Sequence, residues 1–454
     1  MTCDKSDFAA NVKSTLLHRG DNYDCWSCCI IHYAENHDAR IYLSQGQPLC
    51  HRESALANCT QQASKMSSNP DQISVVSLGQ IKLADIRFGD LTVLVGPQAT
   101  GKSIFLQLLK LLVDNGPIVE ELRRFNIDWN GNLGNFLELY FGEGMASIYD
   151  RDSTRLTVDA TSVDLAKLLR GKRTKDERLF FIPAQRVLSL RDGLTRPFTD
   201  YRSGDPFVVR EFSEKLHQLV QTEFGQTPDL FPKSNRLKKA LRDKIDDHIF
   251  GGFGLKTSTD RFQKRMVLSG LAEQTNLPYL VWSAGQREFV PMLLGFYWLM
   301  PPSKTTRREK LEWVVIEEPE MGLHPNAITA VMLMVLELLL RNYRVCLSTH
   351  SPHVLDVVWA LRQLQAQHGR EKDVLDLFGL ATNQETRKIA ASALQKQMRV
   401  YYFQRNGLVT DISTLDPGAA DDAVAGWGGL SEFSGHVGDI VARVVARRCE
   451  ETPA

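Results

Sequence analysis

The distribution of apolar residues predicts a chain in which short buried strands alternate with helices. Continuous apolar runs of about four to eight residues are typical of buried strands, and apolar positions repeated every three or four residues are typical of helices. The runs predict strands at residues 74–78, 79–86, 91–95, 179–182, 312–316, 343–348, 399–403 and 408–412, and alternation of apolar and polar residues predicts strands at 135–140 and 147–158. The helical spacing predicts helices at residues 102–113, 119–125, 165–169, 285–299, 326–341, 352–367 and 384–396. Strands interleaved with helices favour an α/β sheet.

Residues 206–270 interrupt this alternation. Helical spacing appears at 211–223 and 235–249, and a weaker strand-like stretch follows at 252–268. We therefore predict an inserted helical and β segment. The predicted order is a leader at 1–70, an N-terminal lobe at 71–205, the insertion at 206–270 and a C-terminal lobe at 271–454.

The first 70 residues differ in composition from the rest of the chain. Six of the eight cysteines lie within the first 59 residues, whereas the body has the low cysteine content of a reducing compartment. Cys25 and Cys28 have CxxC spacing, with His32 and Cys50 downstream, and thiolate and imidazole groups suit zinc. No second CxxC follows, and the spacing matches no standard zinc finger. We expect a disordered leader, with a zinc site as the alternative.

The overall charge excludes a general electrostatic attraction to nucleic acid or to a membrane. The 454 residues are 43% hydrophobic, and 54 basic residues balance 54 acidic ones. A local basic patch remains compatible with this balance. The insertion carries one candidate patch, at Lys233, Arg236, Lys238, Lys239, Arg242 and Lys244. Its alternative is a solvated helix face. No apolar run reaches the roughly 18 residues that a membrane span needs, so we expect a cytoplasmic protein.

A phosphate-binding loop follows the predicted strand at 91–95. Its sequence, which fits GxxxxGK[ST], is Gly96, Pro97, Gln98, Ala99, Thr100, Gly101, Lys102 and Ser103. In such a loop the backbone N–H groups converge on phosphate oxygens, and the start of the next helix adds a partial positive charge. Lys102 is predicted to reach the β- and γ-phosphates of a nucleotide, and the Ser103 hydroxyl to bind Mg²⁺. The strand before it and the helix after it make a chance match improbable.

Two carboxylates, Glu317 and Glu318, end the predicted strand at 312–316. Its continuous apolar run is typical of a parallel strand buried on both faces, and ligands bind at the carboxyl ends of such strands. Glu317 is predicted to hold Mg²⁺ directly or through water. Glu318 is predicted to orient or deprotonate an attacking water. The alternative is a solvated acidic turn.

The tetrapeptide at 283–286 precedes a predicted helix. Ser283 can cap that helix, and the free N–H groups beside Gly285 and Gln286 can face an anion. The alternative is a helix cap without a ligand.

Two more strands end in candidate site residues. Gln185 follows the strand at 179–182 and is predicted to reach Mg²⁺ or the attacking water, while Arg186 would pair with phosphate or a carboxylate. His350 follows the strand at 343–348, where it would sense the γ-phosphate. The alternatives are a surface turn and a structural histidine.

The order of P-loop, glutamine, Ser-Ala-Gly-Gln, paired glutamates and histidine resembles that of ABC-type ATPases. The segments at 316–325 (IEEPEMGLHP) and 348–352 (STHSP) are similar to those of the non-transporter branch, the OLD (overcoming lysogenization defect), RecF and SMC-like AAA-family ATPases. The resemblance covers about residues 73–445 and includes the segments at 182–186 and 427–434.

This resemblance implies a P-loop NTPase core made of a doubly wound sheet, an antiparallel edge subdomain and a lid. It also implies that two cores enclose two ATP molecules head to tail. The residues that would hold MgATP are Lys102, Ser103 and Glu317. Ser283 and Gly285 would contact the partner's nucleotide, Glu318 would support hydrolysis, and His350 would sense the γ-phosphate.

The sequence differs from two of these families in ways that exclude part of their functions. OLD-type nucleases carry a C-terminal Toprim domain, but only about 100 residues follow His350, and Asp421 and Asp422 lie in a Gly/Ala-rich stretch. We therefore expect no built-in nuclease. No long heptad repeat separates the P-loop from residue 283, which argues against a true SMC protein.

The resemblance also implies a role among stand-alone ATPases of bacterial anti-phage systems such as the Septu, retron-associated and PARIS types. There, the ATPase scaffolds or restrains a separately encoded effector. We expect an ATP-switched scaffold of this kind, as a homodimer or higher oligomer. The alternative is a RecF-like ATPase acting directly on DNA. A transporter subunit is a third class, against which the turn at 319–325 argues.

Overall fold

The structure, a computed structural model, describes most of the chain after residue 68. The described residues are 69–170, 176–224, 228–260, 262–270, 275–302, 307–308 and 310–451, with the backbone of 30–31 and 41–42. The chain divides into two units, Met1–Lys65 and Met66–Ala454. In the first unit, β1 (Ile30–Ile31) pairs with β2 (Ile41–Tyr42) in antiparallel fashion. The predicted disorder and the alternative zinc site fall on residues outside the described part.

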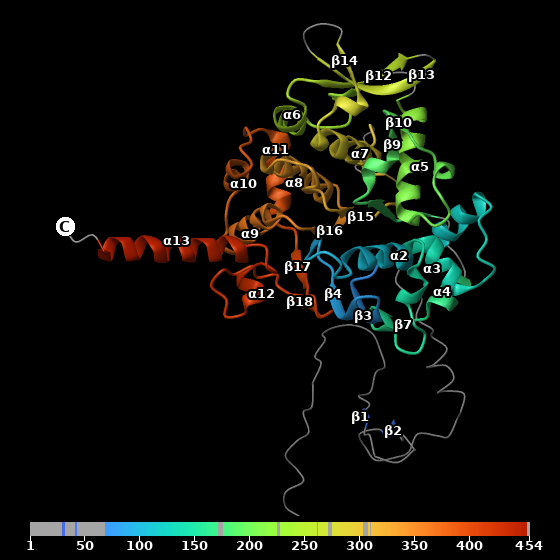
Figure 1. The fold of residues 1–454 in the computed structure, drawn as a ribbon, viewed down its shortest axis with the longest axis horizontal. Helices are drawn as coiled ribbons and strands as arrows, with labels where there is room; N and C mark the ends of the chain where they lie inside the picture. The colour runs from blue at the N-terminus through green and yellow to red at the C-terminus, as the bar shows by residue number, and fades with distance from the viewer. Residues whose placement is uncertain are drawn as a thin grey trace, which may run out of the picture. The chain divides into compact units, whose positions relative to one another are not determined.

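A six-stranded sheet forms the centre of the second unit (Figure 1). Its strands, in order across the sheet, are β18 (Val409–Asp411), β17 (Met398–Phe403), β5 (Leu91–Val95), β16 (Arg344–Thr349), β15 (Trp313–Glu317) and β8 (Leu179–Ile182). All neighbouring strands are parallel except β18, which runs antiparallel to β17. The segments that follow β5, β16, β15 and β8 therefore all begin at one edge of the sheet.

Each face of this sheet contributes to a separate apolar core. Val93 and Val314 belong to one cluster of buried residues, whereas their neighbours Leu94 and Val315 belong to the other. All five residues of β5 and of β15 are buried. Burial on both faces explains why these strands read as unbroken apolar runs in the sequence.

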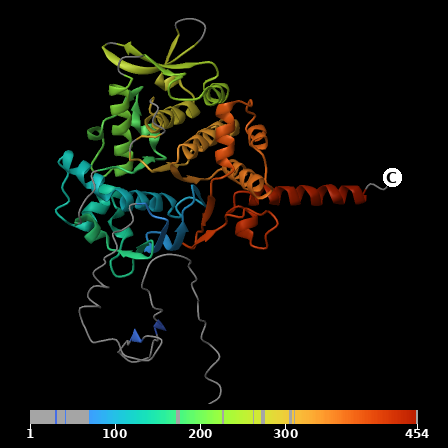
Figure 2. The same cartoon turned by 180° about the vertical axis from the view of Figure 1, so that it is seen from behind.

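Helices cover one face, and a helix with a second sheet covers the other (Figure 1 and Figure 2). The first layer contains α7 (Ala284–Leu299), α8 (Pro325–Leu340), α9 (Pro352–Ala366), α10 (Glu371–Leu377) and α11 (Gln384–Ala393). The second contains α2 (Lys102–Arg124) and an antiparallel sheet of β4 (Ile81–Arg87), β3 (Gln72–Leu78), β6 (Arg155–Val158) and β7 (Thr161–Val163). This arrangement confirms the predicted α/β P-loop fold with an antiparallel edge sheet.

The segment at 206–270 contains helices and strands that extend from the core. Helix α5 (Phe207–Thr222) packs on β8 and α7. It is followed by β11 (Asp229–Phe231), α6 (Lys239–Ile245), β12 (Gly254–Asp260), β13 (Gln263–Ser269) and β14 (Asn276–Pro278). These four strands form their own antiparallel sheet.

Two local predictions were wrong. Residues 135–140, predicted as a strand, lie in helix α3 (Leu133–Phe141), whose first turn is capped by the Asn132 side chain. Its buried residues, Phe136, Leu137, Tyr140 and Phe141, recur at helical spacing. Of the strand expected at 147–158, only β6 exists. The two helices expected at 102–113 and 119–125 are both present as the two parts of α2, which are joined across a kink at Asp114 (φ −119°, ψ 29°), directly after the predicted end of the first helix.

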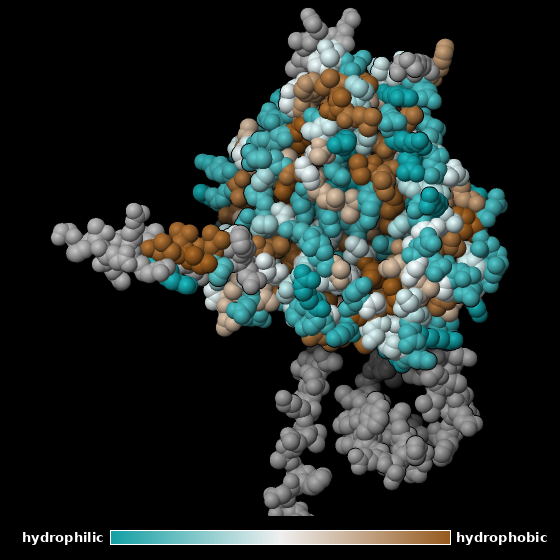
Figure 3. Space-filling model, in the orientation of Figure 1, coloured by the Kyte–Doolittle hydropathy of each residue, from teal (hydrophilic) through white to brown (hydrophobic). Residues whose placement is uncertain are grey.

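The end of the chain forms two further helices, α12 (Asp422–Ala425) and α13 (Glu432–Glu451). Four apolar residues of α13 are exposed, and Figure 3 shows them as an apolar surface on the projecting helix. They are Val437, Ile440, Val441 and Val444.

A short helix, α4 (Leu165–Arg170), completes the N-terminal lobe. None of the described helices is both long enough and apolar enough to cross a lipid bilayer.

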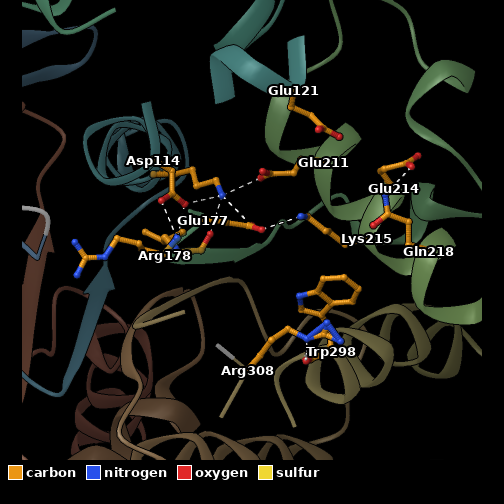
Figure 4. A network of polar contacts seen from close by, with 12 residues as sticks. Asp114, Glu121, Glu177, Arg178, Glu211, Glu214, Lys215, Gln218, Trp298 and Arg308 are labelled. Carbon is orange, nitrogen blue, oxygen red and sulfur yellow. Dashed lines mark hydrogen bonds and ion pairs between the residues drawn. The ribbon is translucent and has the colours of Figure 1, made fainter. Parts of the chain in front are cut away.

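A buried cluster of charges anchors α2 at the break in the helix (Figure 4). The Lys110 ammonium lies 3.0 Å from Asp114, 3.2 Å from Glu177 and 3.1 Å from Glu211. Lys215 of α5 adds a second cation, 2.8 Å from Glu177. Asp114 also accepts hydrogen bonds from the N–H groups of residues 178 and 179, at the start of β8. The cluster therefore joins α2, β8 and α5.

The pKa values of the two glutamates in this cluster shift in opposite directions because their partners differ. Burial raises the pKa of Glu211, and its single contact with Lys110 does not offset that effect. Burial would also raise the pKa of Glu177, but Lys110 and Lys215 together lower it. Lys110 therefore contacts all three acids, whereas Lys215 supports Glu177.

Replacing this lysine should destabilise the protein strongly. Lys110→Met leaves three acids in the core without their shared cation, and we expect a loss of about 3–5 kcal/mol in the free energy of unfolding. Chemical denaturation at neutral pH measures the loss. The matched control is Lys239→Met, because Lys239 forms an exposed pair with Asp243, and exposed pairs contribute only about 0–1 kcal/mol. Equal stabilities of the two variants would contradict this account.

Candidate functional site

The P-loop, residues 96–103, connects β5 to α2 at the carboxyl edge of the central sheet. Gly96 and Gly101 have positive φ angles of 141° and 97°. A Cβ atom on Gly96 would lie 2.3 Å from the carbonyl oxygen of Phe403, and one on Gly101 would lie 2.7 Å from Ile81 Cγ1. Both glycines are therefore required by close approaches from β17 and β4 as well as by backbone geometry.

Lys102 is folded back onto this loop. Its ammonium donates hydrogen bonds to the carbonyl oxygens of Gly96 (2.8 Å) and Pro97 (2.7 Å). Burial lowers its pKa to about 8, against the opposing effect of Glu318, Glu320 and Glu317. Among the described residues, the hydrogen-bond partners of this ammonium are neutral carbonyl oxygens, so its charge can still pair with an anionic ligand.

Glu317 and Ser103 supply oxygen atoms that are suitable ligands for a divalent cation. Glu317 ends β15 with its side chain buried, and its Oε2 accepts a hydrogen bond from Ala184 N–H (3.1 Å). Its Oε1 is buried and has no hydrogen-bond partner among the described residues. Burial raises the pKa of Glu317, while the Ser103 hydroxyl and the Ala184 N–H lower it. A carboxylate oxygen without a donor, beside a hydroxyl, suits the oxygen coordination that Mg²⁺ prefers.

Glu318 faces His350 across the ends of β15 and β16. Its Oε1 lies 3.5 Å from His350 Nε2, and interaction with His350 lowers the pKa of Glu318. The backbone of Glu318 has a φ of 43°, and its N–H donates to the Ser348 carbonyl (2.9 Å). The structure thus brings together two predicted site residues that are far apart in the sequence, with Glu318 ionised and only partly buried.

A third acid, Glu320, was not assigned a role from the sequence. Its Oε1 accepts hydrogen bonds from the Thr349 hydroxyl (2.9 Å) and the His350 N–H (2.6 Å). Burial raises its pKa. Glu320 therefore fixes the loop that carries His350, and its only signal in the sequence is its position in the same turn as Glu317 and Glu318.

Ser283 and Gly285 begin helix α7. The Ser283 hydroxyl accepts from the Gln286 N–H, and the Gln286 side chain accepts from the Ser283 N–H, forming a capping box. A Cβ atom on Gly285 would lie 2.8 Å from the Gly322 carbonyl oxygen, so α7 starts directly against the turn after Glu318. No hydrogen bond or ion pair joins residues 283–286 to the P-loop in the part of the chain that the structure describes.

Gln185 and Arg186 follow β8 and have different surroundings. Gln185 is exposed, at the same sheet edge as the acids. Arg186 is completely buried, donates to backbone carbonyls and lies 3.6 Å from Glu288. The predicted pairing of Arg186 with a carboxylate is therefore observed.

The family comparison covers part of this site. Residues 230–356 match the family model described as "AAA domain, putative AbiEii toxin, Type IV TA system". The matched range contains Ser283, Glu317, Glu318 and His350, but the P-loop lies before it. No protein of curated function matches the sequence.

Two solved structures resemble the fold at a distance. The first, an SmcHead bound to the C-winged helix domain of ScpA, is 9% identical, with 75% of this chain and 96% of that chain covered and a TM-score of 0.36. The second, the SMC head domain from Thermotoga maritima, is 11% identical, with 76% and 98% covered and a TM-score of 0.30. Likenesses this distant carry no argument about activity or partners.

Proposed function

We propose that this chain, an ABC-type AAA ATPase by its P-loop fold and its family match, binds MgATP and hydrolyses it to ADP and phosphate. The observation that carries this proposal is the meeting of three features at one sheet edge. They are the buried ammonium of Lys102, the buried Glu317 oxygen without a donor, and the ionised Glu318.

Each group has a distinct part in the reaction. The backbone N–H groups of the P-loop and Lys102 would bind the phosphates. Ser103 and Glu317 would hold Mg²⁺, with Gln185 as a further ligand, and the cation would neutralise phosphate charge. Glu318 would accept the proton of a water that attacks the γ-phosphorus as the bond to ADP breaks. His350 would hold Glu318 in place and sense the γ-phosphate.

Two observations support a dimer closed by nucleotide. The Gln286 N–H is bound by the Ser283 hydroxyl, but the N–H groups of Ala284 and Gly285 in the first turn of α7 have no acceptor within the helix. Among the residues that the structure describes, no hydrogen bond or ion pair joins residues 283–286 to the P-loop of the same chain. Leu280 and Val281, just before Ser283, are 70% and 62% exposed. In the proposed homodimer, this apolar surface contacts a second copy, and Ser283, Gly285 and Gln286 meet the nucleotide of that copy.

The biological role we propose is an ATP-dependent scaffold for a separately encoded effector in bacterial anti-phage defence. The family description, with its reference to a toxin and a type IV toxin–antitoxin system, supports a link to such systems. A switch of this kind requires that nucleotide bind the closed dimer more tightly than the open form.

The DNA-binding alternative is weakened by the surroundings of the basic stretch. Arg236 is buried and pairs with Glu223, and Lys238 lies 2.7 Å from Glu337. Lys239 pairs with Asp243. Cations that already have acidic partners are poor candidates for a phosphate-binding patch.

Loss of the P-loop lysine should weaken nucleotide binding. Lys102→Ala removes charge-assisted hydrogen bonds worth about 1.5–3 kcal/mol, so the Kd for a fluorescent ATP analogue should rise by about 10- to 100-fold. Lys82→Ala, which removes an exposed lysine of β4, is the control and should bind normally. Unchanged affinity in Lys102→Ala would refute the assigned site.

Loss of the general base should separate binding from turnover. Glu318→Gln keeps the size of the side chain but cannot accept the proton, so turnover should fall by about 10²- to 10⁴-fold with ATP affinity retained. ATP should then hold the variant as a dimer in light-scattering measurements. Glu385→Gln, an exposed acid of α11, is the control. A fully active Glu318→Gln protein would rule out this residue as the base.

The effector proposal is tested by capture from the native host. Tagged Glu318→Gln protein with ATP is the bait, and Lys102→Ala protein is the matched bait that cannot close. We expect a stoichiometric protein partner that is recovered with the first bait and lost with the second. Recovery of DNA without a protein partner would instead support the RecF-like alternative.

A further inference from the structure

A buried arginine connects the acids of the proposed ATPase site to the start of α7. Arg186 is fully buried. Its Nη1 donates to the Glu317 carbonyl (2.9 Å), and its Nη2 donates to the Glu318 carbonyl (3.0 Å). Its Nε donates to the Glu288 carbonyl (3.2 Å) and lies 3.6 Å from the Glu288 carboxylate. One planar guanidinium therefore contacts two segments that are about 30 residues apart in sequence.

The contact with Glu318 coincides with an unusual backbone conformation. Glu318 is not a glycine, yet its φ is 43°. Such a conformation persists only where the surroundings hold it. The described groups that hold it are the Ser348 carbonyl, which accepts from its N–H, and Arg186, which donates to its carbonyl. Because the side-chain direction follows from the backbone, Arg186 helps to set where the Glu318 carboxylate points.

The contact with Glu288 lies one turn after the segment 283–286. The same part of α7 also touches the turn after Glu318, since Gly285 has no room for a Cβ beside the Gly322 carbonyl. The Glu288 Oε2 is buried and has no hydrogen-bond partner among the described residues. Its interaction with Arg186 is therefore the main compensation for its burial.

We propose that Arg186 is a positioning residue that makes the orientation of Glu318 depend on the position of α7. The inference rests on the proposed ATPase function. In the proposed dimer, the start of α7 meets the nucleotide of the second copy. Binding of that nucleotide to α7 would then alter the orientation of Glu318 in the first copy through Glu288 and Arg186. Hydrolysis at one site would therefore depend on occupancy of the other.

The chain contains a matched control for this proposal. Arg236 is also buried, donates to the carbonyls of Tyr297 and Met300 at the other end of α7, and pairs with Glu223. It touches none of the segments assigned to ATP. A purely structural role predicts that Arg186→Met and Arg236→Met lose stability alike and have similar activity.

The first test compares ATP affinity, turnover and melting temperature in these two variants. We expect Arg186→Met to retain its Kd for ATP within about threefold while kcat falls by about 10- to 100-fold, since small misplacement of a reacting group costs this much. Arg236→Met should keep the wild-type kcat despite a similar loss in melting temperature. Arg186→Lys keeps the charge but lacks the fork that reaches two carbonyls, so its kcat should lie between. Equal kcat in Arg186→Lys and wild type overturns the proposal.

The second test measures whether α7 takes part. Arg186→Lys and Glu288→Gln alter the two partners of one contact, so their effects on kcat should be non-additive, with the double variant no worse than the poorer single variant. Additive effects would overturn the link to α7.

A third measurement separates this inference from the proposed function. Hydrogen exchange of the peptide spanning residues 316–323 reports on the turn without nucleotide or turnover. We expect faster exchange in Arg186→Lys and Glu288→Gln, and wild-type exchange in Arg236→Met. If the wild-type protein fails to hydrolyse ATP but exchange changes as expected, the proposed function fails and the positioning role stands. Unchanged exchange in both variants overturns the positioning role, whatever the activity.

Discussion

The parallel register of three strands is the constraint on which the site depends. The hydrogen-bonded pairing of β16 with β5 and β15 sets Thr349 beside Val95 and Ser348 beside Glu317. The P-loop, the paired glutamates and His350 therefore start from one line across the sheet, although the P-loop precedes the glutamates by more than two hundred residues. This register is specified by apolar side chains on both faces of each strand, since a slip of one residue would exchange the two cores.

Several ionisable side chains are buried at the same edge of the sheet. Lys102, Arg186, Glu317 and Glu320 are all mostly buried, and burial shifts the pKa of each toward the neutral form. Lys102 donates hydrogen bonds within the P-loop, Arg186 donates to the carbonyls of Glu317 and Glu318, and the two glutamates accept from neighbouring segments, so each group also fixes a loop. The cluster around Lys110 does the same at the break in α2, about two turns beyond the P-loop. The helix that starts at the phosphate site is thus held by polar contacts at both points, of which Figure 4 shows those at Asp114 and Glu177.

Much of this arrangement could be predicted because its signals are local. The P-loop motif and the unbroken apolar runs of β5 and β15 each indicate their structure within a few residues. The helix α3 was mistaken for a strand because the prediction treats residues 135–140 as alternating between apolar and polar, whereas the Asn132 cap and the spacing of the buried residues both favour a helix. Glu320 could not be assigned a role from the sequence, and for Arg186 only the pairing with phosphate or a carboxylate could be predicted, because their full roles come from contacts with Thr349, Glu288 and the Glu318 carbonyl. These contacts join segments that are brought together only by the sheet.

The position of α7 has a consequence for any symmetric dimer of this chain. In one chain, Gly285 packs against the turn after Glu318, and Glu288 lies beside Arg186. In the proposed dimer, the same turn of α7 faces the nucleotide of the other copy. Each nucleotide would thus contact α7 of the other chain, and that helix is connected through Glu288 and Arg186 to the ATP site of its own chain. The twofold axis repeats this connection for the second nucleotide. Linkage then requires that each site favour binding at the other by the same free energy, so two ATP molecules would close the dimer as a unit.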